Sequence, residues 1–293
     1  MNSIKAISLT SAVHDWQTNT RQPRILHIFD RAWNLINENG EILSIVAPEI
    51  GNGPFNLVVE SDLLFVEHLS VESAVSVSAN DITLGSLNIS TAKAKLWNAK
   101  LDWDSLHSAR DNISSQVKKL PITNYLEHGG FDTSLGGHSG LLNHQHLPTL
   151  QFSNSLPASV ANADLPSSLL AAKGLAGLGQ GLTPSGDDFL MGALHAAWII
   201  HPQEVASGLA QGVAESAAPL TTSLSAAWIR SAGRGEAGEL WHQFFDSLIL
   251  GDEFEIQKTM NKILAVGETS GADALAGFVG VFQSWKIVDS SVS

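Results

Sequence analysis

The chain has 293 residues, 44% of them hydrophobic and 15% charged, a composition typical of a globular protein and not of a disordered one. Its 29 acidic residues outnumber 16 basic ones, and no run of basic residues is present, which argues against nucleic acids and anionic membranes as partners. The absence of cysteine excludes disulfides, thiolate metal sites and cysteine nucleophiles.

The first 120 residues predict a β-rich domain. Short apolar runs separated by Asn, Gly, Pro and Asp are typical of strands. These runs lie at residues 4–9, 24–29, 41–46, 55–59, 63–66, 74–77 and 81–84. Asn39-Gly40, between two of the runs, is a strong signal for a tight turn. The regular spacing predicts an antiparallel sandwich or a small barrel, followed by a helix at about 102–119.

Residues 121–164 predict a long irregular connection, because Gly, Ser, Asn and Pro dominate its composition. The segment contains His128, His138, His144 and His146. Imidazole is a common metal ligand, but the spacing of these histidines matches no metal-binding motif. We therefore interpret the segment as a solvated loop and predict neither a metal nor a cofactor.

Residues 165–293 predict an all-helical domain whose Gly and Ala content favours close packing of helices. Helices are expected at 164–173, 186–200, 203–217, 222–232, 236–250, 252–265 and 271–285. The fold class is therefore predicted as α+β, with a β-rich domain at 1–120, a connection at 121–164 and a helical domain at 165–293. The opening residues do not resemble a signal peptide and no apolar run is long enough to span a bilayer, so we expect a cytoplasmic protein.

Residues 177–192, with the sequence GLGQGLTPSGDDFLMG, combine alternating glycines with a helix start. Alternating glycines allow positive φ angles and leave backbone N–H groups open to a ligand. Ser185 is a natural N-cap, and Asp188 follows three residues later, as in a capping box. The segment predicts either a site for a small anion at a helix N-terminus or simply a well-capped helix.

A second segment, residues 270–277, repeats the pattern S-G-x-D-x-L-x-G at an offset of 85 residues. The repeat predicts two related helix starts that converge on one pocket; the alternative is a capping device used twice. Asp187 has Ala272 as its counterpart, so capping does not explain its acidic side chain. An acid beside an anion site suggests a metal bridge, a proton acceptor or a hydrogen-bond acceptor for a substrate N–H.

Polar residues outside these two motifs offer further candidates. Thr221 and Thr222 precede a predicted helix, where capping is the favoured interpretation. Arg230 and Arg234 could hold a carboxylate substrate, although surface ion pairs are the simpler interpretation. His27 is interpreted as a structural histidine on a strand.

Three blocks, GLGQGLTPSGDDFLMG, TTSLSAAWIRSA and AVGETSGADALAG, resemble the bacterial family that includes the AllH subunit of oxamate carbamoyltransferase. The block HIFDRAWNLINENGEILSI is similar to the opening segment of that family. The resemblance implies a role in anaerobic allantoin and purine nitrogen catabolism, together with AllF-type and AllG-type subunits. Such a complex moves a carbamoyl group between oxalurate and phosphate, giving oxamate and carbamoyl phosphate.

The resemblance also implies a set of site residues. Asp187 and Asp188 are the expected catalytic groups. The expected substrate-binding residues are Asn34, Gly179, Gly181, Thr183, Ser185, Gly186, Thr221, Thr222, Ser270, Gly271 and Asp273, around a small anion such as carbamoyl phosphate or oxamate. Two alternatives stay open: a subunit that binds a metabolite or supports assembly without catalysis, and a metal-dependent hydrolase that uses the aspartates and the loop histidines.

Overall fold

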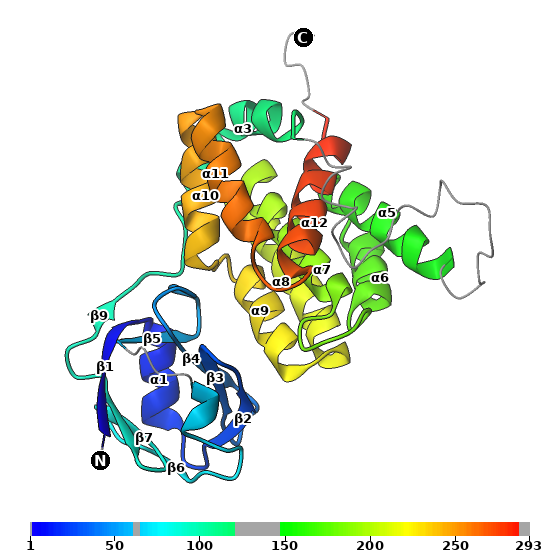
Figure 1. Cartoon of the computed structure of the whole chain (residues 1–293). Helices are drawn as coiled ribbons and strands as arrows, with labels where there is room; N and C mark the ends of the chain where they lie inside the picture. Colours follow the sequence, from blue (N-terminus) through cyan, green and yellow to red (C-terminus); the bar gives the residue numbers. More distant parts are fainter. Residues whose placement is uncertain (1, 61–64, 121–146, 287–293) are drawn as a thin grey trace. The chain divides into compact units, whose positions relative to one another are not determined.

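The structure is a computed structural model that describes residues 2–60, 65–120 and 147–286 (Figure 1). The chain divides into two compact units, one formed by residues 1–100 with 237–239 and the other by 101–236 with 240–293. The first is rich in strands and the second is helical, which confirms the predicted α+β class. Residues 101–120, which we expected in the first domain, belong to the helical unit. Trp103 explains this placement, because its ring stacks on Trp198 at 5.5 Å and its Nε1 donates to the Gly235 carbonyl.

The described strands of the first unit form one sheet of nine strands. They are β1 (Asn2–Leu9), β2 (Arg24–Ile28), β3 (Ala32–Ile36), β4 (Ile42–Val46), β5 (Asn56–Glu60), β6 (Val75–Val77), β7 (Asp81–Leu84), β8 (Leu87–Ser90) and β9 (Lys95–Leu96). Their order is β2-β3-β4-β5-β1-β8-β7-β6, and β9 pairs with β1. The sheet curls around α1 (Ser11–Asn19) into a nearly closed barrel (Figure 1).

The sheet differs from the expected antiparallel one in three places, because β1 runs parallel to β8 and β9, and β4 runs parallel to β5. Helix α1 was not predicted, since most of its residues are polar; Val13 and Trp16 pack into the apolar core of the barrel. The prediction of a strand at 63–66 is wrong for the described residues 65 and 66, because Phe65 begins a 3-10 helix. The ring of Phe65 stacks on Trp33 at 3.7 Å. Residues 61–64 lie outside the described part.

The helical unit follows the predicted series closely. Its described helices are α2 (Trp103–Ser108), α3 (Arg110–Val117), α5 (Leu147–Ala161), α6 (Leu165–Leu175), α7 (Ser185–Ile200), α8 (Gln203–Ala217), α9 (Ser223–Gly233), α10 (Glu239–Leu250), α11 (Glu253–Leu264) and α12 (Ser270–Ser284). The prediction of an irregular connection at 121–164 is wrong for residues 147–161, which form α5. The four histidines of that segment lie outside the described residues. None of the described helices has the length and apolarity needed to cross a membrane.

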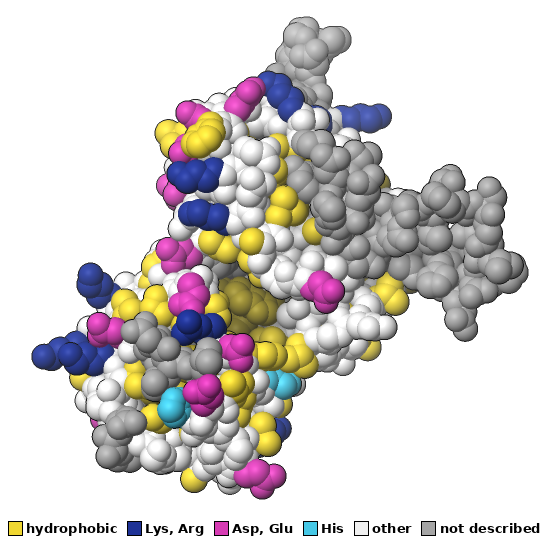
Figure 2. Space-filling model, in the orientation of Figure 1, with side chains coloured by type: hydrophobic (Ala, Val, Ile, Leu, Met, Phe, Trp, Pro, Cys, Tyr) yellow, Lys and Arg dark blue, Asp and Glu magenta, His cyan; other side chains and the backbone are white. Residues whose placement is uncertain are grey.

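Helix α7 is the centre of the helical unit. All of its residues except Met191 are buried, and it packs against α12, α9, α8 and α5. Basic side chains on the face drawn in Figure 2 are scattered among acidic ones, so the described residues form no basic patch there.

His195 of α7 is an uncharged group inside this core. Its ring lies 5.0 Å from Trp241 and 6.0 Å from Phe245, and burial lowers its pKa to about 3. The unfolded chain binds a proton at this residue below its ordinary pKa of 6.5, whereas the folded chain stays neutral down to about pH 3. The contribution of His195 to the free energy of unfolding therefore decreases as the pH falls from about 6.5 to about 3.

We expect His195→Leu to reduce the loss of stability in acid. The free energy of unfolding, measured with urea, should decrease between about pH 7 and about pH 4.5. This decrease should be smaller in the variant than in wild type by roughly 2 kcal/mol, because leucine takes up no proton on unfolding. His14→Leu, at an exposed position on α1, is the matched control for the loss of a histidine. An equal acid loss in His195→Leu and wild type would show that the buried imidazole is not responsible.

Candidate functional site

The glycine loop before α7 has the backbone geometry that its sequence predicts. Gly177, Gly179 and Gly181 have φ angles of 71°, 121° and 89°, values that only glycine adopts without strain. Residues 179–181 are exposed, and within the described part of the chain their N–H groups donate no hydrogen bond. The loop thus presents a short run of free backbone donors to solvent.

Asp187 fixes this loop to the start of α9. Its Oδ1 accepts a 2.8 Å hydrogen bond from the Gly177 N–H, and its Oδ2 accepts one from the Thr221 hydroxyl. Burial raises its pKa, while the bonds from Thr221, Gly177 and Ser225 act in the opposite direction. Because both oxygens hold the loop, the carboxyl that capping could not explain has a positioning role.

We expect Asp187→Ala to loosen the glycine loop without unfolding the unit. Alanine offers no acceptor to the Gly177 N–H or to the Thr221 hydroxyl, so both bonds are lost, at a cost of about 1–3 kcal/mol for each. Hydrogen exchange at the Gly177 amide should speed up in proportion. Asp246→Ala, at an exposed position on α10, is the matched control, and equal exchange in both variants would contradict the positioning role.

The residues that cap α9 also form hydrogen bonds with the glycine loop. Thr222 is the N-cap of α9, as expected, and its hydroxyl accepts from the Ser225 N–H at 3.1 Å. The same hydroxyl donates to the Leu182 carbonyl at 2.6 Å, and the Ser225 hydroxyl lies 3.4 Å from that oxygen. Ser225 was not predicted as a site residue, although its three-residue spacing from Thr222 is the ordinary spacing of a cap.

The repeated glycines bring α7 and α12 into reciprocal contact. A Cβ at Gly192 would lie 1.8 Å from the Ala274 carbonyl oxygen, and one at Gly277 would lie 2.0 Å from the Phe189 carbonyl oxygen. The last glycine of each repeat thus contacts the fifth residue of the other repeat. Such reciprocal contacts define an internal pseudo-twofold relation between the two helices.

The other repeated glycines, Gly186 and Gly271, lie against the preceding helix. A Cβ there would come within 2.0 Å of the Leu175 carbonyl and 1.8 Å of the Ile263 carbonyl, respectively. All four glycines are therefore required by close backbone approach.

The serine caps predicted for α7 and α12 are wrong. The N-caps are Pro184 and Thr269, and neither makes a side-chain cap bond. Carbonyls of the preceding loops replace the caps, since Gly186 N–H donates to Leu178 and Gly271 N–H donates to Val266. Ser270 is thereby free to bond elsewhere, and its hydroxyl lies 2.9 Å from the hydroxyl of Thr183. This contact joins the two helix starts.

Three buried carboxyls lie around this junction. Asp187, Asp188 and Asp273 are only 2%, 7% and 1% exposed. Burial raises the pKa of Asp188 to about 8, with Asp273 and Asp187 adding to the rise and the Ser270 and Thr183 hydroxyls opposing it. Asp188 Oδ2 is buried and has no hydrogen-bond partner among the described residues. The predicted capping box is wrong as well, because the N-cap is Pro184, which has no N–H to donate to the Asp188 carboxyl.

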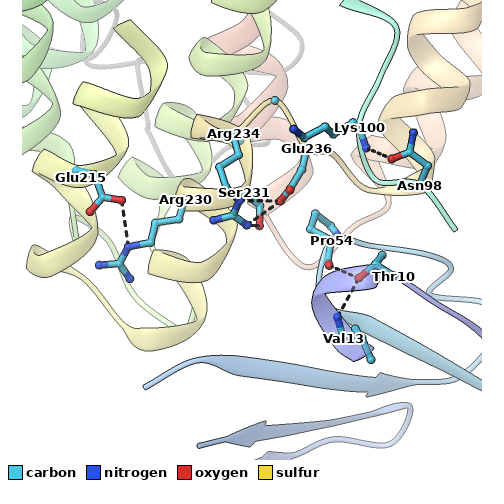
Figure 3. Close-up of polar contacts among 12 residues, drawn as sticks. Thr10, Val13, Pro54, Asn98, Lys100, Glu215, Arg230, Ser231, Arg234 and Glu236 are labelled. Atoms are coloured by element: carbon cyan, nitrogen blue, oxygen red, sulfur yellow. Dashed lines mark hydrogen bonds and ion pairs between the residues drawn. The ribbon is translucent and has the colours of Figure 1, made fainter. Parts of the chain in front are cut away.

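The basic candidates are engaged at the surface. Arg230 pairs with Glu215 at 3.6 Å, and Arg234 pairs with Glu236 at 2.7 Å and donates to the Ser231 hydroxyl (Figure 3). The ion-pair interpretation is therefore confirmed. No ion pair among the described residues involves Asp187 or Asp188.

Two other residues singled out in the sequence belong to the first unit. Asn34 belongs to β3 of the first unit, where its Oδ1 accepts a 2.6 Å hydrogen bond from the Ser44 hydroxyl. Its role in substrate binding stays a prediction. His27 is half-buried on β2, and burial lowers its pKa. Among the described residues, no group of three His, Asp or Glu side chains could hold a metal ion.

The fold and the site define an α+β protein whose helical unit carries two glycine-rich helix starts in reciprocal contact. Residues 175–282 match the model of a family described as oxamate carbamoyltransferase subunit AllH, and residues 5–96 match the AllH family N-terminal domain. The chain belongs to the AllH family, as its sequence motifs predicted. No solved structure matches the chain.

Proposed function

We propose that the chain is a subunit of an oxamate carbamoyltransferase and binds a small anionic substrate where α7 and α12 begin. Family membership supports the type of enzyme. The observation that carries the location is the row of free N–H groups at residues 179–181, held by Asp187 beside the Thr183–Ser270 contact. Backbone donors of this kind bind oxyanions without a basic side chain.

The proposed reaction needs no covalent intermediate on the protein. The amide nitrogen of oxamate attacks the carbamoyl carbon of carbamoyl phosphate, the bond from that carbon to the bridging oxygen breaks, and phosphate leaves with the electron pair. The nitrogen loses one proton, which phosphate takes up, and the product is oxalurate. Loop N–H groups that hold the phosphate oxygens would stabilise the charge that develops as this bond breaks.

Most of the predicted site residues keep their assignments within this proposal. The free loop donors are Gly179 and Gly181, and the hydroxyls are Thr183, Ser185, Thr221, Thr222 and Ser270, with Asp188 and Asp273 beside them. Gly186 and Gly271 contribute close helix packing, because their N–H groups donate to Leu178 and Val266. Asp187 acts by holding the loop. The protein works in the cytoplasm in allantoin and purine nitrogen catabolism, with AllF-type and AllG-type subunits as its partners.

A second candidate function is that of a binding subunit whose partner performs the chemistry. It is favoured by the absence of a Lys or Arg from the hydrogen bonds and ion pairs of Asp187 and Asp188 in the described part of the chain. A phosphate that leaves a carbamoyl group is usually neutralised by cationic groups. In this case the partner subunit would supply that cation.

The test is phosphate release from carbamoyl phosphate with and without oxamate, for the chain alone and with AllF-type and AllG-type subunits. We expect oxamate-dependent release with the partners, reduced about tenfold by Ser270→Ala. Ser284→Ala, at the other end of α12, is the matched control and should match wild type, since its hydroxyl bonds only within its helix. No oxamate-dependent release in either mixture would contradict the carbamoyltransferase; normal turnover of Ser270→Ala in an intact complex would favour the binding subunit.

A further inference from the structure

Two large apolar side chains lie in solvent at the turn between α10 and α11. Leu250, the last residue of α10, is 77% exposed, and Phe254, in the first turn of α11, is 74% exposed. Ile249 beside them is 39% exposed. Figure 2 shows hydrophobic side chains together with acidic ones at this end of the two helices. Adjacent exposed apolar side chains with a polar rim are typical of interaction surfaces, and we call this one the apolar turn.

The apolar turn is not part of the packing of its own helices. The buried residues of α10 and α11 are Trp241, Phe244, Phe245, Ser247, Leu248, Ile256, Thr259, Met260 and Ile263. Leu250 shares a helix face with Asp246, four residues earlier, and Phe254 shares one with Lys258, four residues later. Both faces are otherwise polar, so the two apolar side chains stabilise the hairpin little and are available to a partner.

The turn is held in one conformation. Gly251 has a φ angle of 73°, and Asp252 caps α11 by accepting from the N–H groups of Phe254 and Glu255 at 2.9 and 3.1 Å. A Cβ at Gly251 would lie 3.0 Å from Gln116 Nε2, so the turn also lies against α3. A surface that is already ordered loses little conformational entropy when it binds a partner.

Acidic side chains surround the apolar turn. The exposed acids next to it are Asp246, Asp252 and Glu253. None of these three forms an ion pair with another described residue. The nearby lysines are engaged, since Lys258 pairs with Glu255 at 3.0 Å and Lys262 donates to Gln243 at 2.8 Å. The rim of the surface is therefore acidic.

The acidic rim determines which kind of partner fits. A second copy of this chain would bring the three carboxylates against their own counterparts, because a twofold interface joins identical patches. Like charges that face one another across an interface oppose binding. A partner with an apolar pocket and a rim of Lys or Arg matches both features of the surface. The chain belongs to a family described as an enzyme subunit, which implies such a second kind of chain.

We propose that the apolar turn is the docking surface for a different subunit of the enzyme, which offers an apolar pocket to Leu250 and Phe254 and a basic rim to the surrounding carboxylates. This inference rests on the proposed function, which includes partner subunits, and adds the surface on which one of them docks. The surface is distinct from the proposed anion site, because α11 separates the turn from the loop that leads to α12. The twelve residues of α11 span about 18 Å.

The experiment measures binding of the full chain to AllF-type and AllG-type subunits by surface plasmon resonance. We expect the double variant Leu250→Gln, Phe254→Gln to bind one of these subunits at least about thirtyfold more weakly than wild type, because two large anchors of the interface are lost. Val205→Gln, at an exposed position on α8, is the matched control and should bind like wild type. Circular dichroism should show that both variants fold, since the replaced side chains lie in solvent and glutamine favours helices.

Charge reversal at the rim distinguishes the occupants. Against a basic rim, Glu253→Lys should weaken binding about tenfold, and added salt should weaken wild-type binding. If a second copy occupied the surface instead, Glu253→Lys would remove repulsion and strengthen self-association, which analytical ultracentrifugation detects.

Unchanged affinity of the double variant for both subunits would overturn the docking surface, as would a self-association of wild type that the double variant abolishes. Failure of wild type to bind either subunit would overturn it too. Phosphate release separates this proposal from the proposed function. A docking defect should lower oxamate-dependent release at low partner concentration and recover at high concentration. If wild type binds its partner through the apolar turn but shows no oxamate-dependent release, the docking surface holds and the carbamoyltransferase fails.

Discussion

Replacing Gly192 by alanine should destabilise the helical unit by at least about 3 kcal/mol. The new Cβ would lie 1.8 Å from the Ala274 carbonyl oxygen, a backbone atom that cannot move aside without separating α7 from α12. Gly277→Ala should have a similar effect, because its Cβ would lie 2.0 Å from the Phe189 carbonyl oxygen. Urea unfolding followed by circular dichroism measures both.

Gly208→Ala is the matched control for these variants. Gly208 lies in α8, and a Cβ there would meet no atom within 4 Å. Alanine has the higher helix propensity, so this change should stabilise the protein by up to about 1 kcal/mol. Equal effects of Gly192→Ala and Gly208→Ala would contradict the reciprocal packing of the two repeats.

Replacing Asp188 by asparagine should stabilise the fold at neutral pH by up to about 4 kcal/mol. The ordinary pKa of the carboxyl is 3.8, and the folded chain raises it to about 8. Between these values the unfolded chain releases the proton and the folded chain keeps it, so wild-type stability falls as the pH rises from about 4 to about 8. Asparagine is neutral in both states, so the variant does not lose stability as the pH rises.

The difference in unfolding free energy between Asp188→Asn and wild type, measured from about pH 4 to about pH 8, isolates this effect. It should increase steadily with pH. Asp164→Asn should show no such increase, because hydrogen bonds from Ser167 lower the pKa of Asp164 and asparagine also caps helices. A difference that is constant with pH would show that Asp188 is ionised in the folded chain.

Much of the helical unit could be predicted, because its signals are local. Helices α7 to α12 begin and end within a few residues of the predicted bounds, where Gly, Pro, Ser and Thr mark the chain. Helix α5 could not be predicted, since its prolines and polar residues are typical of a loop. Its packing is non-local: Phe152 fills the space beside Gly174, and Pro157 lies against Gly280.

In the sheet, too, the positions of the strands could be predicted from local patterns, whereas the pairing of distant strands could not. Alternating apolar runs located most of the strands, but the parallel pairing of β1 with β8 joins residues 85 positions apart, such as Asn2 and Leu87. Local patterns carry no information on such pairings. The helix that the barrel encloses, α1, is polar apart from the few residues that face the core.

In the candidate site, the sequence showed the repeat but not the residues that form hydrogen bonds with it. The S-G-x-D-x-L-x-G pattern predicted two related helix starts, and the structure joins them through Thr183 and Ser270. The serines were expected to cap their own helices because a cap is the commonest use of Ser at a helix start. Carbonyls of Leu178 and Val266 take that role instead, which only the folded loops reveal.

The central claim, that the glycine loop binds a small anion, is tested most directly by the amide NMR signals of residues 179–181. On titration with oxamate or phosphate, we predict that these signals shift together and reach saturation, because their N–H groups are the free donors of the loop. The Gly208 amide, within α8, should stay in place. Saturable binding that leaves the signals of residues 179–181 unchanged would place the anion elsewhere and contradict the account.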